Sequence, residues 1–354
     1  MKQLTFGTIT LVFSLSLVIL CGELAIRLYH YVSRGPYMFR YIMLDDTLGW
    51  RPTENLLFRG ETQDAVGQHY QLDIQTNKDG FRIFGDIQEN KKKKVLFIGD
   101  SFTHAIEVSN DKAYYSVLQD ALPIEVFAFG VCGYGTLQEF MILDRWIEKI
   151  NPSLVILQYT SNDFINNHYD LERRSYYNNN SMMRPYLTKY GTLIYAFPKP
   201  WPHFHEFSNR YSQFVHFLLR RIDFLQSTWT ITVEDVISKE GAAFPPLQES
   251  IGITENILKK IQARLPSGTT TAVFAVDDTQ PYYDIFKSIT NNRHIDFLDG
   301  VPQAIHEAER HGIVVMAADK AHWNERGHRI AAEVLQPHIS KLLLGGNHQG
   351  HNAK

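Results

Sequence analysis

The sequence is poor in cysteine and in net charge, and each shortage excludes a class of protein. Its two cysteines, Cys21 and Cys132, make no disulfide framework, because the first lies inside an apolar N-terminal run. A formal net charge of −3 argues against nucleic acid as a partner, and we expect none. His203, His205 and Glu206 have metal-ligand spacing, but no further cluster accompanies them and we expect no metal there.

The longest uncharged stretch lies at the N-terminus, from Leu4 to Cys21. As a helix it would be about 27 Å long, close to the thickness of the hydrocarbon core of a bilayer. We expect an uncleaved single-span anchor that contacts the membrane through residues 4–21. A cleaved signal peptide is the alternative, although the run is long for one and no small-x-small cleavage site follows. Lys2 on one side and Arg27, Arg34 and Arg40 on the other leave the orientation undecided.

Beyond Lys94, short apolar runs alternate with segments of helical periodicity. This alternation predicts an α/β protein with a parallel sheet and helices on both of its faces. The expected strands have the sequences "KVLFIGD", "IEVFAFG", "SLVILQYT", "TTAVFAVDD" and "HGIVVMAAD". The expected core helices are 111–121, 137–150 and 324–343.

Changes in composition and periodicity along the sequence predict how the chain is divided into parts. We expect a membrane anchor and juxtamembrane helix at 1–34, a small extended region packed on the core at 35–90, and a disordered tail at 344–354. The main domain is expected at 91–343. An insertion rich in aromatic residues, asparagine and proline interrupts it at about 164–252 and is expected to form a lid or wall of the site.

Polar or glycine-rich groups follow four of the predicted strands. Ligands bind at the carboxyl ends of the strands in open parallel sheets, so these groups are expected to meet at one edge. They are "GDS" with Ser101, "GVCGYGT" with Gly133, "SND" with Asn162, and "DKAHWNERGH" with Asp319 and His322. Each residue has a structural interpretation as a cap or turn residue when taken singly. A single site explains all five together.

The residue types indicate nucleophilic catalysis. A serine is a weak nucleophile without a base, and His322 is the candidate base for Ser101. Asp319, three residues before His322, is placed to accept from the imidazole Nδ1–H and fix its tautomer. The backbone N–H of Ser101, the N–H of Gly133 and the side-chain amide of Asn162 are the expected donors to an oxyanion.

In order and spacing, these blocks resemble those of the SGNH, or GDSL, hydrolases, with Ser101, Gly133, Asn162 and His322 as the four named residues. Asp319 matches the Asp of the family's Asp-x-x-His block. The resemblance extends over about 94–343, and "LGWRP … TNKDGFRI" before it is similar to a segment of membrane-anchored bacterial members. It implies a three-layer α/β/α sandwich with a flavodoxin-like parallel sheet, and a Ser-His-Asp ester hydrolase that needs no metal or cofactor.

Three functions therefore remain open from the sequence. The first is a serine esterase or deacylase that acts through an acyl-enzyme on an acylated cell-envelope component or lipid ester. The second is an O-acyltransferase that uses the same residues to acylate a surface polysaccharide. The third is a catalytically idle envelope assembly protein. The resemblance and the anchor together favour an extracytoplasmic, periplasmic catalytic domain, and the sequence does not determine the substrate or oligomeric state. The dense aromatic segment around Trp201 is expected to line an acyl pocket or touch lipid headgroups.

Overall fold

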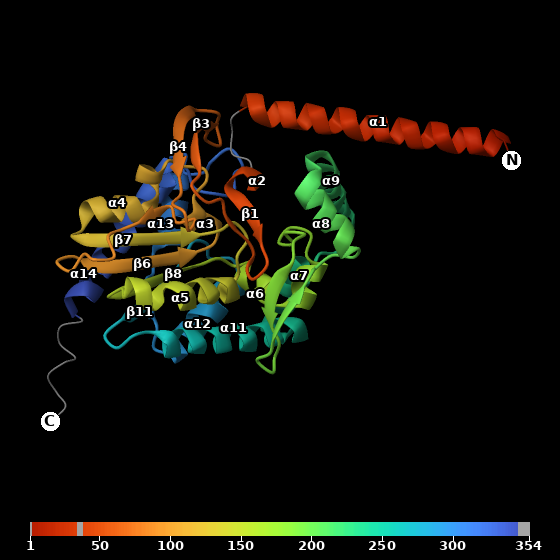
Figure 1. The fold of residues 1–354 in the computed structure, drawn as a ribbon. Helices are drawn as coiled ribbons and strands as arrows, with labels where there is room; N and C mark the ends of the chain where they lie inside the picture. The colour runs from red at the N-terminus through yellow and green to blue at the C-terminus, as the bar shows by residue number, and fades with distance from the viewer. Residues whose placement is uncertain (1, 34–37, 346–354) are drawn as a thin grey trace.

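The computed structural model describes residues 2–33 and 38–345 of the chain (Figure 1). A single long helix, α1 (Lys2–Ser33), begins the chain, and its amino-terminal half extends past the rest of the molecule. Its segment Phe6–Val32 is long and apolar enough to cross a membrane, as the sequence predicts, and a signal sequence would pass the same test. Most of the expected tail, from 346 onward, lies outside the described residues.

A six-stranded sheet forms the centre of the molecule, in the order β12-β11-β8-β6-β7-β5. All neighbouring strands are parallel except β5, which pairs antiparallel with β7 at one edge. The strands are β5 (Ile83–Phe84), β6 (Lys93–Gly99), β7 (Ile124–Gly130), β8 (Leu154–Tyr159), β11 (Thr270–Ala275) and β12 (Asp296–Phe297). Apart from β5, this is the doubly wound order in which the direction of winding reverses beside β6, where sites form.

Each face of the sheet is covered by helices, because the strands are apolar on both sides. Along β6, Leu96 and Ile98 belong to one buried cluster, while Val95 and Phe97 belong to the other. The first cluster is completed by α5 (Thr136–Ile150), α11 (Pro245–Arg264) and α12 (Tyr282–Asn292). The second is completed by α4 (Tyr114–Ala121), α13 (Val301–Arg310) and α14 (Glu325–Gly345). The expected three-layer α/β/α sandwich is therefore confirmed.

The two remaining parts of the chain pack against the end of the sheet where the site lies. Residues 38–75, before β5, form a short helix and two hairpins: α2 (Met38–Tyr41), β1 (Ile42–Asp45), β2 (Gly49–Pro52), β3 (Leu57–Gln63) and β4 (His69–Gln75). The insertion between β8 and α11 contains one hairpin and several helices. Its elements are α6 (Asp163–Asn166), α7 (Tyr169–Arg174), β9 (Arg184–Leu187), β10 (Leu193–Ala196), α8 (Pro202–Tyr211), α9 (Gln213–Trp229), α10 (Val233–Glu240) and the 3-10 turn η2 (Gly241–Ala243).

The prediction of a strand at residues 311–319 is wrong. The position beyond β11 is taken by β12, which the sequence analysis missed because it is only two residues long. The segment 314–317 is instead held by isolated bridges, between Met316 and Trp323 and between Ala317 and Asp64. A short apolar run indicates burial, and burial alone does not distinguish a sheet strand from an extended segment beside the sheet.

The end of β7 approaches the helix that follows β6 so closely that only glycine fits there. A Cβ on Gly130 would lie 2.3 Å from the backbone nitrogen of His104, which cannot move independently of its helix. We expect Gly130→Ala to lower the free energy of unfolding by about 1–3 kcal/mol, the usual cost of overpacking. Thermal and denaturant unfolding of the full chain in detergent would measure it.

Gly252→Ala is the matched control, because Gly252 lies inside α11 and a Cβ there would meet nothing within 4 Å. Alanine is the better helix former, so this substitution is expected to stabilise by roughly 0.5–1 kcal/mol. Equal effects of the two substitutions would contradict the close approach at Gly130.

Candidate active site

The turn after β6 holds Ser101 at the start of the short helix α3 (Ser101–His104). Asp100 caps this helix, since its side chain accepts a hydrogen bond from the N–H of Phe102 at 3.2 Å. The amide oxygen of Gln158, on β8, accepts from the N–H groups of Asp100 and Thr103 at 3.1 and 3.2 Å. The turn is therefore fixed by the neighbouring strand as well as by its own cap.

Ser101, His322 and Asp319 are joined by two hydrogen bonds. The Nε2 of His322 lies 2.8 Å from Oγ of Ser101, and its Nδ1 lies 2.5 Å from Oδ2 of Asp319. The other carboxylate oxygen of Asp319 accepts from the backbone N–H groups of Ala321 and His322, which holds the tight turn before α14. The three residues expected from widely separated blocks thus meet in the hydrogen-bonded order that a serine nucleophile needs.

A second carboxylate, that of Glu107, also faces the imidazole. Its Oε1 lies 3.7 Å from Nδ1 of His322, and its side chain is largely buried. Burial by itself would lower the pKa of His322, but the charge of Glu107 and the hydrogen bond and charge of Asp319 outweigh it and raise that pKa to about 9. Burial also raises the pKa of Glu107, while the nearby His322 opposes the rise. The two carboxylates therefore favour the protonated form of His322.

Sequence reasoning missed Glu107. The only signal was a lone acidic residue within the apolar run "HAIEV", which is as typical of a solvated turn as of a site. Glu107, Asp319 and His322 are also the one group of three potential metal ligands found among the described residues, and their mutual contacts already account for them. His203, His205 and Glu206 form no such group.

The expected oxyanion donors line one cavity of about 580 Å³ beside the serine. Ser101, Gly133 and Asn162 all face it, together with Glu107, Asp319 and His322. Within residues 2–33 and 38–345, the N–H groups of Ser101 and Gly133 have no hydrogen-bond acceptor. Asn162 Nδ2 donates to Oδ1 of Asn166 at 3.2 Å, which orients the amide and leaves its second hydrogen available.

The loop that carries Gly133 is held by the hairpin of residues 42–52 and by the insertion. Trp50, on β2, donates from Nε1 to the carbonyl of Cys132 at 2.9 Å, and its own carbonyl accepts from the hydroxyl of Tyr134 at 2.6 Å. Arg184, on β9, donates from Nη2 to the carbonyl of Gly133 at 2.7 Å. Gly133 itself has φ +74°, and a Cβ there would lie 2.3 Å from Nδ2 of Asn180. Arg184 belongs to none of the sequence blocks. Trp50 lies in the segment "LGWRP", to which the sequence analysis assigned no role in the site.

Trp201 does not line this cavity. It is 78% exposed, at the start of α8. The part of the sequence expectation that placed it in an acyl pocket is therefore wrong, since the cavity wall contributed by the insertion is made by Tyr177, Asn178 and Asn180.

No protein-family model matches the sequence, and no curated protein matches it. Several solved structures are similar in their overall arrangement. The esterase EstA from Pseudoalteromonas sp. is 12% identical, with 72% of this chain and 100% of that chain covered and a TM-score of 0.41. A putative lipolytic protein of the G-D-S-L family from Desulfitobacterium hafniense DCB-2 is 12% identical, with 70% and 99% covered and a TM-score of 0.35.

A catalytic mutant of Axe2, an acetylxylan esterase from Geobacillus stearothermophilus, is 14% identical, with 71% and 96% covered and a TM-score of 0.36. The chain is thus similar to two esterases and to a protein of the G-D-S-L family. At these identities and TM-scores, the similarity assigns no role to any residue, and the roles depend on the geometry described above.

The charge of Glu107 beside His322 predicts how the reaction rate depends on pH. His322 must be neutral to accept a proton, so any reaction that uses it as a base is expected to accelerate as the pH rises toward about 9. Glu107→Gln removes one of the charges that raise the pKa of His322. The acidic limb of the pH–rate profile should then move to lower pH, by about one pH unit.

The measurement is kcat/KM for an aryl ester, or the rate of labelling by a serine-directed phosphonate, as a function of pH. Glu148→Gln is the control, because this exposed carboxylate pairs with Arg264 on α11, away from the cavity. An unchanged acidic limb in Glu107→Gln would show that Glu107 does not act on His322.

Proposed function

We propose that the chain is a serine ester hydrolase anchored in a membrane. The observation that carries the proposal is the continuous line from Ser101 Oγ through the imidazole of His322 to Asp319, at 2.8 and 2.5 Å, on the wall of an open cavity. A structural role for Ser101 alone would not require this line, because Asp100 already caps α3.

The chemistry follows from the donors and acceptors in place. Oγ of Ser101 attacks the ester carbonyl carbon while His322 Nε2 takes the hydroxyl proton, and the carbonyl electrons move onto the oxygen. The N–H groups of Ser101 and Gly133 and the amide of Asn162 are proposed to donate to that oxyanion. The C–O bond to the leaving alcohol then breaks, and His322 returns the proton to the alkoxide. A water repeats the sequence on the acyl-serine and releases the acid.

The second part of the proposal is that α1 is a retained anchor and not a removed signal sequence. It is supported by contacts that the helix makes beyond its uncharged stretch. The carboxylate of Glu23 accepts from Ser212 Oγ at 2.8 Å and from the N–H of Phe214 at 2.9 Å, and Arg27 donates to the carbonyl of Tyr211 at 3.2 Å. Cleavage by a signal peptidase beyond the apolar run would remove part of α1 and some of these contacts.

The substrate class we propose is an acyl ester of the cell envelope or of a lipid, because the anchor would hold the cavity close to such esters. An extracytoplasmic position for the catalytic domain is proposed from the sequence resemblance. The cavity volume of about 580 Å³ accommodates an acyl ester together with part of its alcohol.

The nucleophile assignment predicts covalent labelling of Ser101. Incubation of the full chain in detergent with a fluorophosphonate is expected to add one phosphonyl group, seen by intact mass and placed on Ser101 by peptide mapping. Ser101→Ala should give no adduct. Ser116→Ala is the control, because Ser116 is a buried serine on α4 that donates to the carbonyl of Asn110 and lies outside the cavity. Labelling that persists in Ser101→Ala would refute the assignment.

The proposed roles also predict the sizes of the kinetic losses. Ser101→Ala, His322→Ala and Asp319→Asn are each expected to remove most turnover. Their combined loss should be far smaller than the product of the single losses, since the three residues act as a unit. Asn162→Ala is expected to lower kcat by roughly 10²–10³, as for a lost oxyanion donor. Steady-state hydrolysis of an aryl acetate by the full chain would measure these values, and losses that multiply independently would contradict a triad.

A further inference from the structure

The hydrogen bonds between α1 and α9 place α9 at a definite level along the anchor. Glu23 binds Ser212, Gln213 and Phe214 at the start of α9, only two residues after the uncharged stretch ends at Cys21. A Cβ on Gly22 would lie 2.6 Å from the ring of Phe214, so the two helices are also in close contact. The start of α9 is thus fixed where α1 would leave the hydrocarbon core.

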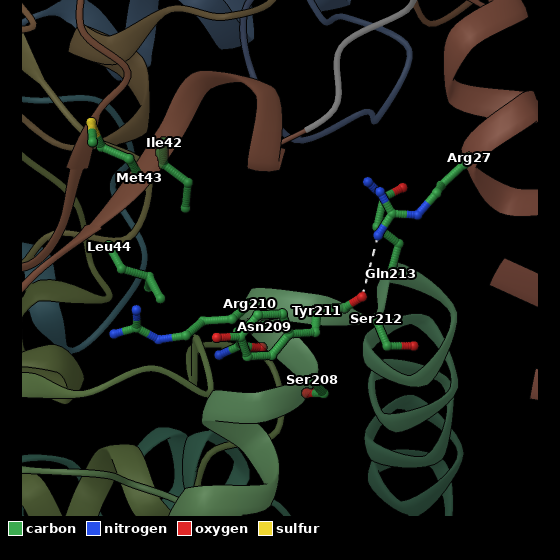
Figure 2. A pocket seen from close by; sticks show the side chains of 10 residues that line it. All are labelled: Arg27, Ile42, Met43, Leu44, Ser208, Asn209, Arg210, Tyr211, Ser212 and Gln213. Atoms are coloured by element: carbon green, nitrogen blue, oxygen red, sulfur yellow. Dashed lines mark hydrogen bonds between the residues drawn. The ribbon is translucent and has the colours of Figure 1, made fainter. Parts of the chain in front are cut away.

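From this point α9 runs across the direction of α1 and not along it (Figure 1). Figure 2 shows the junction from close by, with Arg27 of α1 directed at the backbone of Tyr211 immediately before α9. A helix that begins at the edge of the hydrocarbon core and runs across the spanning helix lies along the plane of the membrane.

The two faces of α9 differ sharply. Its exposed face carries an apolar stripe that we call the α9 stripe, with successive spacings of four, three and four residues: Leu218, Ile222, Leu225 and Trp229. Its inner face is polar and bonded to the protein. There Arg220 donates to the carbonyl of Asn179 at 2.7 Å, and Asp223 pairs with Lys199 at 2.9 Å. The helix is therefore held in one rotation, with its apolar stripe outward.

We propose that the α9 stripe lies in the surface of the lipid bilayer beside α1. The proposal rests on the proposed anchor and goes beyond it by assigning a second contact with lipid. Lipid is the occupant that the position favours, because the stripe continues from the junction at which the spanning helix emerges. Arg221, exposed beside the stripe with its guanidinium 5.0 Å from the centre of the Phe217 ring, provides a cation at the level of anionic headgroups. The neighbouring helix α8 adds further exposed aromatic side chains: Phe204, Phe207 and Tyr211.

The natural tryptophans of the chain test the proposal. Only Trp201 and Trp229 are exposed, at 78% and 81%, while Trp50, Trp146 and Trp323 are buried in the catalytic part. Trp201→Phe therefore leaves Trp229 as the one tryptophan that bilayer lipid can reach. The full chain with this substitution is reconstituted into vesicles of phosphatidylcholine with a minority of phosphatidylglycerol. The same vesicles are prepared with phosphatidylcholine brominated on its acyl chains, which quenches tryptophan in contact with them.

We expect brominated lipid to quench a large part of the emission, and the further substitution Trp229→Phe to abolish that quenching. Leu225→Asp, in the Trp201→Phe background, should reduce the quenching, because it places a charge in the stripe while Trp229 remains as the reporter. Val66→Asp is the matched control, because Val66 is an exposed apolar residue at the turn between β3 and β4, and it should leave the quenching unchanged.

Flotation of the vesicles distinguishes failure of this proposal from failure of the proposed anchor, because it reports whether the chain is bound to the vesicles at all. If the chain floats with the vesicles but Trp229 is not quenched, the bilayer contact of α9 is overturned and the anchor stands. If the chain does not float, both are overturned. If Trp229 is neither quenched by brominated lipid nor reached by aqueous iodide, another protein or a second copy covers the stripe, and the proposal is likewise overturned.

Discussion

The geometry of the site depends on the contacts of one buried side chain, the guanidinium group of Arg184. It pairs with the buried carboxylate of Glu172 at 2.8 Å, donates to the carbonyl of Gly133, and lies 4.6 Å from the centre of the Trp50 ring. These partners come from the insertion, the loop after β7 and the first hairpin. An unpaired charge at this depth would be strongly destabilising, so the three segments must assemble together around it. The loop of Gly133 is consequently held both by the first hairpin and by the insertion.

The segment before the central domain supports the site in the same way. Trp50 bonds the carbonyl of Cys132, and Arg82 donates to the carbonyls of Ala105 and Val108 beyond the carboxyl end of α3. One residue thus supports the loop of Gly133, and the other supports the turn that follows Ser101. The region of residues 38–84 is in this sense part of the site, although none of its charged groups takes part in the proposed chemistry.

The sequence predicted the sandwich and the meeting of Ser101, Asp319 and His322, because periodicity and strand ends are local signals that topology converts into proximity. It did not predict Glu107, Trp50 or Arg184. Their roles arise from contacts between segments far apart in the chain, and no spacing encodes such contacts. The expected strand at 311–319 failed for the same reason, since which apolar segment takes the edge position beside β11 is decided by packing. The exposed position of Trp201 likewise depends on how α8 is docked, which its local sequence does not reveal.

The contact between Gly22 and Phe214 fixes the position of α9, and of the protein around it, relative to α1. A domain joined to its membrane helix by a flexible linker would adopt many heights and orientations above the membrane. It could then act on esters at many distances from the lipid. With α1 as the proposed anchor, the contacts between α1 and α9 would hold the rest of the protein at one height above the membrane. For the proposed ester hydrolase, the search for substrate would then be lateral, and the distance of an ester from the lipid surface would decide, together with its chemistry, whether it reaches Ser101.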